Sequence, residues 1–167
     1  MLTFSARIFP LVALAMSIYH LWQVMIPKMD PTLHQDVHLA FALSLVFLSA
    51  MNVKESDKPG RALLSQLVSL FFLICSLVST IYIYTNFGAL VNRAGRYTSV
   101  DTVIGLIMIL AVLEATRRTY GILLPSLVTI ALLYGHFGYL LPGIFRHSGY
   151  SWPRLIASVT TYLYGIF

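Results

Sequence analysis

Charged residues are scarce in this sequence, and their scarcity excludes most soluble classes of protein. Only 10% of the 167 residues are charged, whereas 58% are hydrophobic and the mean hydropathy is +0.81. A soluble domain carries about 25% charged residues, so 11 Lys and Arg with 6 Asp and Glu cannot cover a globule in water. The high hydrophobicity excludes a disordered chain. The basic residues are scattered, so no nucleic-acid partner is expected. These absences predict an integral membrane protein surrounded by a lipid bilayer.

Recognisable catalytic chemistry is also missing. Cys75 is the single cysteine, which leaves no intramolecular disulfide and no cysteine-based metal site. There is no nucleophile elbow, phosphate-binding loop or pair of carboxylates suited to acid–base work. His34 and His38 share a helix face, but zinc needs a third protein ligand. Asp30 and Asp36 are near, but Pro31 is expected to interrupt the helix, and Asp36 points off the shared face. We therefore expect no catalytic, cofactor-binding or metal-binding residues. We also expect that the protein is not an enzyme.

What the sequence does contain is five apolar segments, at residues 8–26, 35–52, 62–86, 102–116 and 122–141. A helix needs about 20 apolar residues to cross a bilayer core about 30 Å thick. The first segment is longer than the apolar region of a cleavable signal peptide, which is about 7–15 residues. It is therefore expected to be a transmembrane helix. Residues 102–116 would be only about 22 Å long as a helix. That segment either spans, with arginine side chains reaching the interface, or packs part of the way in.

The fold class expected is therefore all-α and polytopic, with four to five transmembrane helices in a domain of residues 1–149. Residues 53–61 form the most polar stretch and predict a solvent loop with a Pro-Gly turn. Asp101 is expected to cap a helix that begins at Thr102. The close pair Gly135 and Gly138 predicts tight helix packing or a local bend. Lys and Arg are divided almost evenly between the two ends of the segments, so the positive-inside rule only slightly favours a cytoplasmic N-terminus.

The tail, residues 150–167, has the clearest periodicity. Ser151 can cap a helix that has Pro153 in its first turn. Apolar side chains then repeat at helical spacing, with Arg154, Ser158 and Thr161 on the opposite stripe. This pattern predicts an amphipathic arm that lies in the membrane interface or against a partner's transmembrane helices. The candidate contacts with a partner in this arm are Trp152, Arg154, Leu155, Val159 and Leu163.

A second candidate contact is the charged cluster at the end of segment 102–116. Glu114 and Arg118 are four residues apart and can pair on one helix face, with Arg117 beside them. Ionisable groups at membrane depth are candidates for function, whereas arginine in a last helical turn also suits the helix dipole and lipid headgroups. Two interpretations stay open, a contact with another subunit and an interfacial anchor.

Three runs of residues carry a resemblance to a known family. They are residues 113–121 (LEATRRTYG), 38–43 (HLAFAL) and 139–143 (YLLPG) followed by 147–151 (HSGYS). In order and spacing they resemble the small membrane domain of tripartite ATP-independent periplasmic (TRAP) transporters of the TAXI subclass. The resemblance covers about residues 33–167, and the E-A-T-R-R block is its most specific part.

The resemblance implies a small, non-catalytic subunit in the inner membrane of a bacterial cell. Its partners would be a large 12-helix permease subunit and a periplasmic TAXI-type solute-binding protein. The complex would take up an organic acid by cation-coupled symport, with the small subunit as a scaffold. In fused relatives a glutamate typically stands at the place of Tyr164. That departure favours a separate subunit over a fusion cut at its boundary.

A different class of function remains as the alternative, the membrane anchor subunit of a respiratory oxidoreductase that holds haem or quinone. His20, His38 and His136 lie on predicted helices and would be its haem ligands. They lie near segment ends, whereas a bis-histidine haem needs ligands well inside a bundle. A third and weaker option is a channel that conducts alone.

Overall fold

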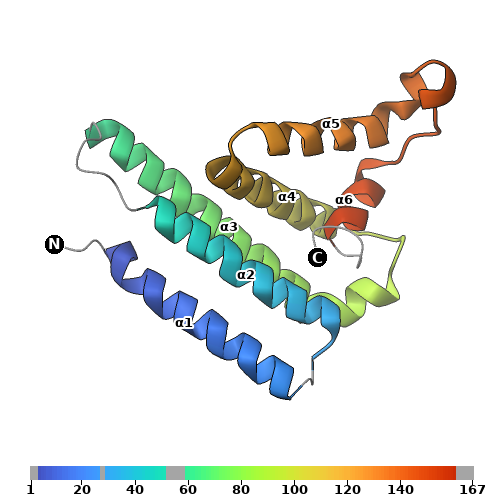
Figure 1. The fold of residues 1–167 in the computed structure, drawn as a ribbon. Coiled ribbons are helices and arrows are strands. Elements are labelled where there is room, and N and C mark those ends of the chain that lie inside the picture. Colours follow the sequence, from blue (N-terminus) through green and yellow to red (C-terminus); the bar gives the residue numbers. More distant parts are fainter. Residues whose placement is uncertain (1–3, 27–28, 52–58, 161–167) are drawn as a thin grey trace. The chain divides into compact units, whose positions relative to one another are not determined.

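The computed structural model describes residues 4–26, 29–51 and 59–160, and every regular element in these ranges is helical. The predicted all-α class is thus confirmed for the described chain. The helices are α1 (Phe4–Met25), α2 (Pro31–Ala50), α3 (Pro59–Asn92), α4 (Ser99–Tyr120), α5 (Leu123–Phe137) and α6 (Trp152–Thr160), with 3-10 turns η1 (Gly138–Leu140) and η2 (Gly143–Phe145) after α5. Figure 1 shows their order along the chain.

Within the described residues, five helical stretches are long and apolar enough to cross a membrane, by length and composition. They are Ser5–Met25, Pro31–Ala50, Ala62–Asn92, Ser99–Tyr120 and Leu123–Leu140. The helix expected at 102–116 is longer than its apolar run, because α4 continues through the charged residues to Tyr120. Its 22 residues measure about 33 Å at 1.5 Å per residue. The expectation of a short fourth helix was therefore wrong.

The surface of these helices is apolar. On α1 the side chains of Leu11, Leu14, Ile18 and Leu21 are each more than half exposed. Soluble monomers rarely expose contiguous apolar patches of more than a few hundred Å², whereas such side chains are compatible with a hydrocarbon environment. The exposed aliphatic surface and the span lengths both indicate a membrane protein.

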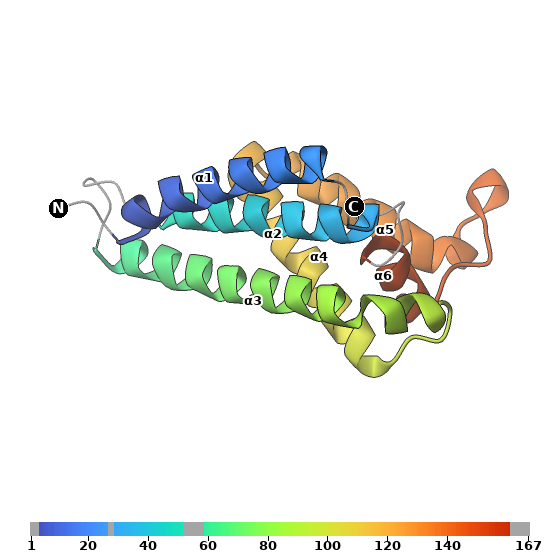
Figure 2. The same ribbon diagram turned by 90° about the horizontal axis from the view of Figure 1, so that it is seen from below.

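The chain divides into two compact units, residues 1–84 and 85–167, and each is described by itself. In the first unit α2 lies between α1 and the part of α3 before residue 85 (Figures 1 and 2). Phe47 of α2 and Phe72 of α3 stack with ring centroids 5.8 Å apart. The Gln66 amide of α3 donates to the carbonyl oxygen of Met51, at 3.3 Å. The helices of this unit are therefore joined by large side chains.

The start of α2 differs from expectation. Asp30 is the N-cap, and its carboxylate accepts a hydrogen bond from the Thr32 N–H at 2.8 Å. Pro31 follows at the first helical position, where a proline is favoured because its missing N–H would have had no helical partner. Pro31 therefore begins the helix, and the prediction that it interrupts the helix was wrong. The Pro-Gly turn expected at 59–60 was also wrong, since these residues open α3, while 53–58 lie outside the described residues.

The cap of α4 also differs from the prediction. Thr98 is the N-cap, and its hydroxyl accepts from the Asp101 N–H at 3.2 Å. The Asp101 carboxylate accepts in return from the Thr98 N–H at 2.8 Å, which completes a capping box. The same carboxylate accepts from Arg93 at 2.6 Å. Asp101 therefore acts at the third helical position, so the prediction of Asp101 as N-cap with a start at Thr102 was wrong.

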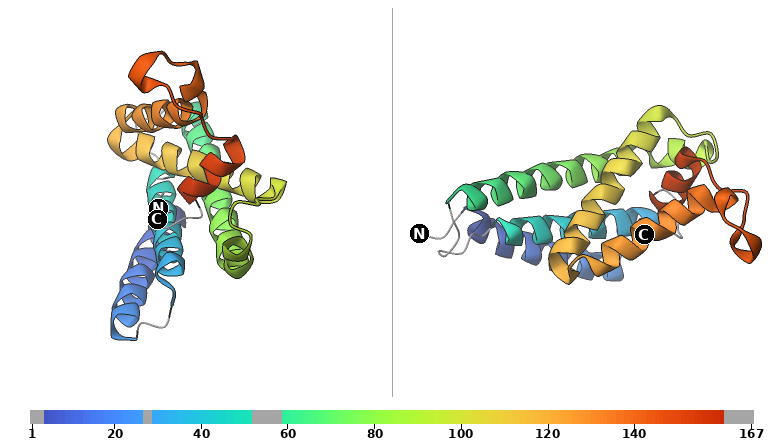
Figure 3. Two further views of the ribbon diagram at one scale, coloured as in Figure 1. Left: turned by 90° about the vertical axis from the view of Figure 1, so that its right-hand side faces the viewer. Right: turned by 90° about the horizontal axis from the view of Figure 1, so that it is seen from above.

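In the second unit α4 and α5 form a tight hairpin, with only Gly121 and Ile122 between them. Gly121 closes α4 with φ of 82°, a conformation that favours glycine because it has no Cβ. Helix α6 begins directly after Ser151 and packs on both α4 and α5 (Figure 3). A Cβ on Gly105 of α4 would lie 2.6 Å from the Ile156 side chain, and a Cβ on Gly135 of α5 would lie 2.7 Å from Leu155.

The prediction for Gly135 and Gly138 is confirmed, because Gly135 allows tight packing and Gly138 lies where α5 gives way to a 3-10 turn. The His147 ring lies directly against Gly138, in the space that a Cβ would occupy. The His147 Nε2 lies 3.1 Å from the carbonyl oxygen of Tyr134, and its Nδ1 accepts from the Gly149 N–H at 3.0 Å. The chain after α5 is thereby held against the end of that helix. The proposed division between a domain of residues 1–149 and an arm of 150–167 stays a prediction.

Candidate functional site

The arginine cluster (Glu114, Arg117 and Arg118) forms as the sequence predicts. The predicted pair exists, since Arg118 Nε lies 2.7 Å from Glu114 Oε1. Arg117 binds the same carboxylate in a fork, with Nε 2.7 Å from Oε2 and Nη2 2.9 Å from Oε1. The side chains of Glu114 and Arg118 are only 14% exposed, whereas that of Arg117 is 50% exposed. One carboxylate is therefore shared by two guanidinium groups of unequal exposure.

The charge of the arginine cluster decides what it can do. Two guanidinium groups against one carboxylate leave a net charge of about +1 in the last two turns of α4. A cation at this end suits the negative end of the helix dipole. The half-exposed Arg117 presents free donor surface, and guanidinium recognises planar anions such as carboxylates well. Both interpretations open from the sequence, a subunit contact and an interfacial anchor, remain compatible with this geometry.

The candidate residues of the arm have different environments. Trp152 stacks on His136 of α5, with centroids 4.2 Å apart and an interplanar angle of 26°. The Arg154 guanidinium carbon lies 5.3 Å from the centre of the Tyr150 ring. Three further candidates complete the set, of which Leu155 is buried, Val159 is half-buried and Leu163 lies outside the described residues.

These arm residues and the arginine cluster occupy different places on α4. The contact of α6 with α4 centres on Gly105, nine residues before Glu114, which is about 14 Å along a helix axis. Leu155 packs within its own unit, against Gly135. Trp152 and Arg154 keep exposed surface. The structure therefore presents two separate candidate contact regions.

A histidine cluster joins α1 to α2. His20 Nδ1 lies 2.7 Å from the Met16 carbonyl oxygen, which can only accept, so this nitrogen carries the proton. In neutral His20 the Nε2 then accepts from His38 Nδ1, 2.9 Å away. His34 Nδ1 lies 3.0 Å from the Tyr19 hydroxyl. Within the described ranges no group of three or more His, Cys, Asp or Glu side chains could hold a metal ion.

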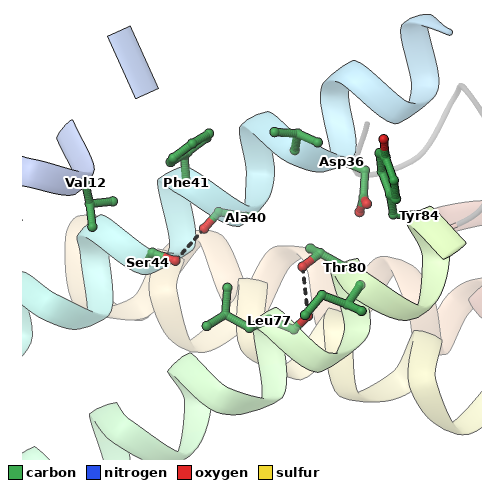
Figure 4. Close-up of a pocket in the computed structure, with 10 residues that line it drawn as sticks. Val12, Asp36, Ala40, Phe41, Ser44, Leu77, Thr80 and Tyr84 are labelled. Carbon is green, nitrogen blue, oxygen red and sulfur yellow. Dashed lines mark hydrogen bonds between the residues drawn. The ribbon is translucent and has the colours of Figure 1, made fainter. Parts of the chain in front are cut away.

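The pair of histidines does turn one face of α2 toward α1, while Asp36 turns elsewhere, as the spacing predicts. Asp36 lines a cavity of about 480 Å³ between α2 and α3, with Val12 of α1 at its edge (the α2–α3 cavity). Figure 4 labels Asp36 of α2 and Tyr84 of α3, which both line it, toward one end of the view. Phe41 and Leu77 are among the apolar side chains that line the rest.

Sequence reasoning missed this cavity. One signal could have drawn attention to it, because Asp36 is an ionisable residue inside a candidate membrane span, and such residues mark functional sites by default. Asp36 is only 1% exposed, and its Oδ1 makes no hydrogen bond within the described part of the chain. The cavity walls come from α2 and α3, more than 30 residues apart in the sequence.

Taken together, the fold and these sites define a chain whose regular elements, in the described ranges, are helical, with five helices there long and apolar enough to cross a membrane. No family model, curated protein or solved structure matches the chain.

Proposed function

We propose that this chain is the small, non-catalytic membrane subunit of a TAXI-type TRAP transporter. In this role it scaffolds a large permease subunit in the bacterial inner membrane, for cation-coupled uptake of an organic acid delivered by a periplasmic binding protein. The observation that carries the proposal is the arginine cluster, which lies in the E-A-T-R-R block that most resembles this family. Its shared carboxylate and half-exposed Arg117 suit a contact with a second membrane subunit.

The exposed apolar surface also supports a scaffolding role. Long stretches of α1, α3 and α5 leave Leu, Ile and Val side chains open, and lipid or a neighbouring helix can cover them. Association of helices in a membrane depends on close packing and on interhelical hydrogen bonds. The exposed donors of Arg117 and the indole of Trp152 can add such bonds at the edge of an apolar contact.

The direct test is co-purification of the tagged chain with a large permease encoded beside it. We expect a stoichiometric complex from detergent, and we expect Arg117→Ala to reduce recovery of the permease. The Arg96→Ala variant is the matched control, because Arg96 is an exposed arginine outside the cluster. Full recovery of the permease with Arg117→Ala and Glu114→Ala would leave the cluster as an interfacial anchor. Failure of the wild-type chain to bind the permease would overturn the proposal.

Absorption spectroscopy of the same preparation separates this proposal from an oxidoreductase anchor. A Soret band lost in His20→Ala or His38→Ala would favour the haem-binding alternative. The hydrogen bond between these two rings already occupies His20 Nε2, which is one of the nitrogens that an iron atom would need.

A further inference from the structure

The α2–α3 cavity has the size of a ligand site. Its volume of about 480 Å³ lies within the range of roughly 300–1,000 Å³ that is typical of small-molecule pockets. Apolar side chains such as Val37, Phe41 and Ile81 form most of its wall. Asp36 is the one ionisable carboxylate among the lining residues. A predominantly apolar wall with a single acid selects an apolar molecule that carries one polar donor.

The Ser44 and Thr80 hydroxyl groups of the cavity do not donate to Asp36. The Ser44 hydroxyl donates to the Ala40 carbonyl oxygen at 2.7 Å, and the Thr80 hydroxyl lies 3.1 Å from the Ser76 carbonyl oxygen (Figure 4). Asp36 Oδ1 is left without a donor in the described chain, although the residue is 1% exposed. A buried carboxylate oxygen needs a hydrogen-bond donor. Asp36 is one of the residues that line the cavity.

The positions of the lining residues along α2 and α3 suggest how a ligand is oriented in the cavity. Asp36 and Tyr84 lie at one end, and Ser44 and Leu77 lie farther along the two helices. Eight residues of α2 separate Asp36 from Ser44, which is about 12 Å. Asp36 is also only five residues from Pro31, the first residue of α2, about 8 Å from the start of the helix. If α2 crosses the bilayer, the acid is near the headgroups and the rest of the cavity runs toward the hydrocarbon.

We propose that the α2–α3 cavity binds one membrane lipid whose headgroup is a primary ammonium, with the ammonium at Asp36 and an acyl chain along the cavity. The ammonium N–H donates to Asp36 Oδ1 and its charge balances the carboxylate. A quaternary ammonium has the same charge but no N–H, so it leaves the carboxylate oxygen without a donor. The selectivity therefore comes from the hydrogen bond in addition to the charge. The proposal concerns this chain alone and does not depend on the transporter assignment.

The test is native mass spectrometry of the purified full chain with added phosphatidylethanolamine or phosphatidylcholine of identical acyl chains. We expect one phosphatidylethanolamine to bind at least about tenfold more tightly, which is the value of a charge-assisted hydrogen bond. The Asp36→Asn variant should lose this preference. The matched control is Asp30→Asn, which removes an exposed carboxylate six residues away and keeps a good N-cap residue. It should retain the preference.

A second variant tests the cavity without touching the acid. Ala40→Leu adds three carbons to the cavity wall and should reduce binding of both lipids. Dodecylamine and dodecyltrimethylammonium form the last pair of probes, and only the primary amine should compete with the lipid. Equal binding of the two lipids by the wild type, or a preference that survives Asp36→Asn, would overturn the proposal. Binding of dodecylamine without binding of phosphatidylethanolamine would overturn it as well.

Discussion

Glu114 and Arg118 form an ion pair across one turn of α4, with 2.7 Å between Oε1 and Nε and only 14% of each side chain exposed. The neighbouring pair of Glu114 with Arg117 is equally short, but the Arg117 side chain is 50% exposed. The two ion pairs therefore share one carboxylate but differ in the exposure of the arginine. We expect the more buried pair with Arg118 to contribute more to stability.

Removal of Glu114 should affect stability more than removal of Arg117. The Glu114→Ala variant leaves the sheltered Arg118 without this carboxylate, and we expect a loss of roughly 1–3 kcal/mol. The Arg117→Ala variant removes a half-exposed partner, for which about 1 kcal/mol or less is expected. Thermal unfolding of both variants in the same detergent measures the order. Equal unfolding midpoints for the two variants would contradict the larger contribution expected from the buried Glu114–Arg118 pair.

The start of α4 offers a second test. Asp101→Ala removes both the capping-box carboxylate and the ion pair with Arg93, whose bond is 2.6 Å long. The Thr98→Ala variant removes the N-cap hydroxyl, at a cost of about 1 kcal/mol. We therefore expect the midpoint of thermal unfolding to fall further for Asp101→Ala. A double-mutant cycle with Arg93→Ala isolates the ion pair. A coupling energy of zero would show that the pair does not contribute to stability.

The contact of α6 with α4 depends on the small size of Gly105. A methyl group there would lie 2.6 Å from Ile156 and 2.9 Å from the Thr160 hydroxyl, so Gly105→Ala should displace α6 and accelerate tryptic cleavage after Arg154. The control is Gly88→Ala in α3, where a Cβ meets nothing within 4 Å. That change should leave cleavage unaltered and stabilise its helix by up to about 1 kcal/mol. Unchanged cleavage in Gly105→Ala would show that α6 does not depend on this contact.

The segment after α5 should be sensitive at Gly138. The His147 ring already occupies the position of a Cβ there. Its Nδ1 accepts from the Gly149 N–H and its Nε2 lies 3.1 Å from the Tyr134 carbonyl oxygen, which holds the ring in place. We expect Gly138→Ala to lower the unfolding midpoint. The expected loss in the free energy of unfolding is roughly 1–3 kcal/mol, as for other overpacked sites. His147→Ala in the same chain should restore part of the loss by opening space. An additive loss in the double variant would refute the steric cause.

Several features could be predicted from the sequence because their causes are local. Hydropathy within a window of about 20 residues identifies a membrane span, and the described part of the chain contains five such helices. The pair of Glu114 with Arg118 follows from a spacing of four on a helix. The opposed directions of His38 and Asp36 follow from helical periodicity in the same way.

Helix ends could be predicted less well, because each end depends on a choice between neighbouring polar residues. Asp101 and Thr98 are both suitable N-caps, and the choice of Thr98 allows Asp101 to bind its N–H and Arg93 together. The length of α4 was underestimated for a related reason. The Glu114 carboxylate neutralises one of two arginines, which removes part of the cost of continuing the helix through charged residues.

The sequence by itself determined the class of protein, the apolar segments and the contacts within a single helix, since these depend on residues only a few positions apart. Tertiary structure alone decided which distant side chains meet. It placed Ile156 and Thr160 on Gly105, and it brought Leu77 and Tyr84 of α3 into the same cavity as Asp36 of α2. A cavity and an acid without a donor arise only when two helices pack, because no spacing along one helix specifies the shape of the other.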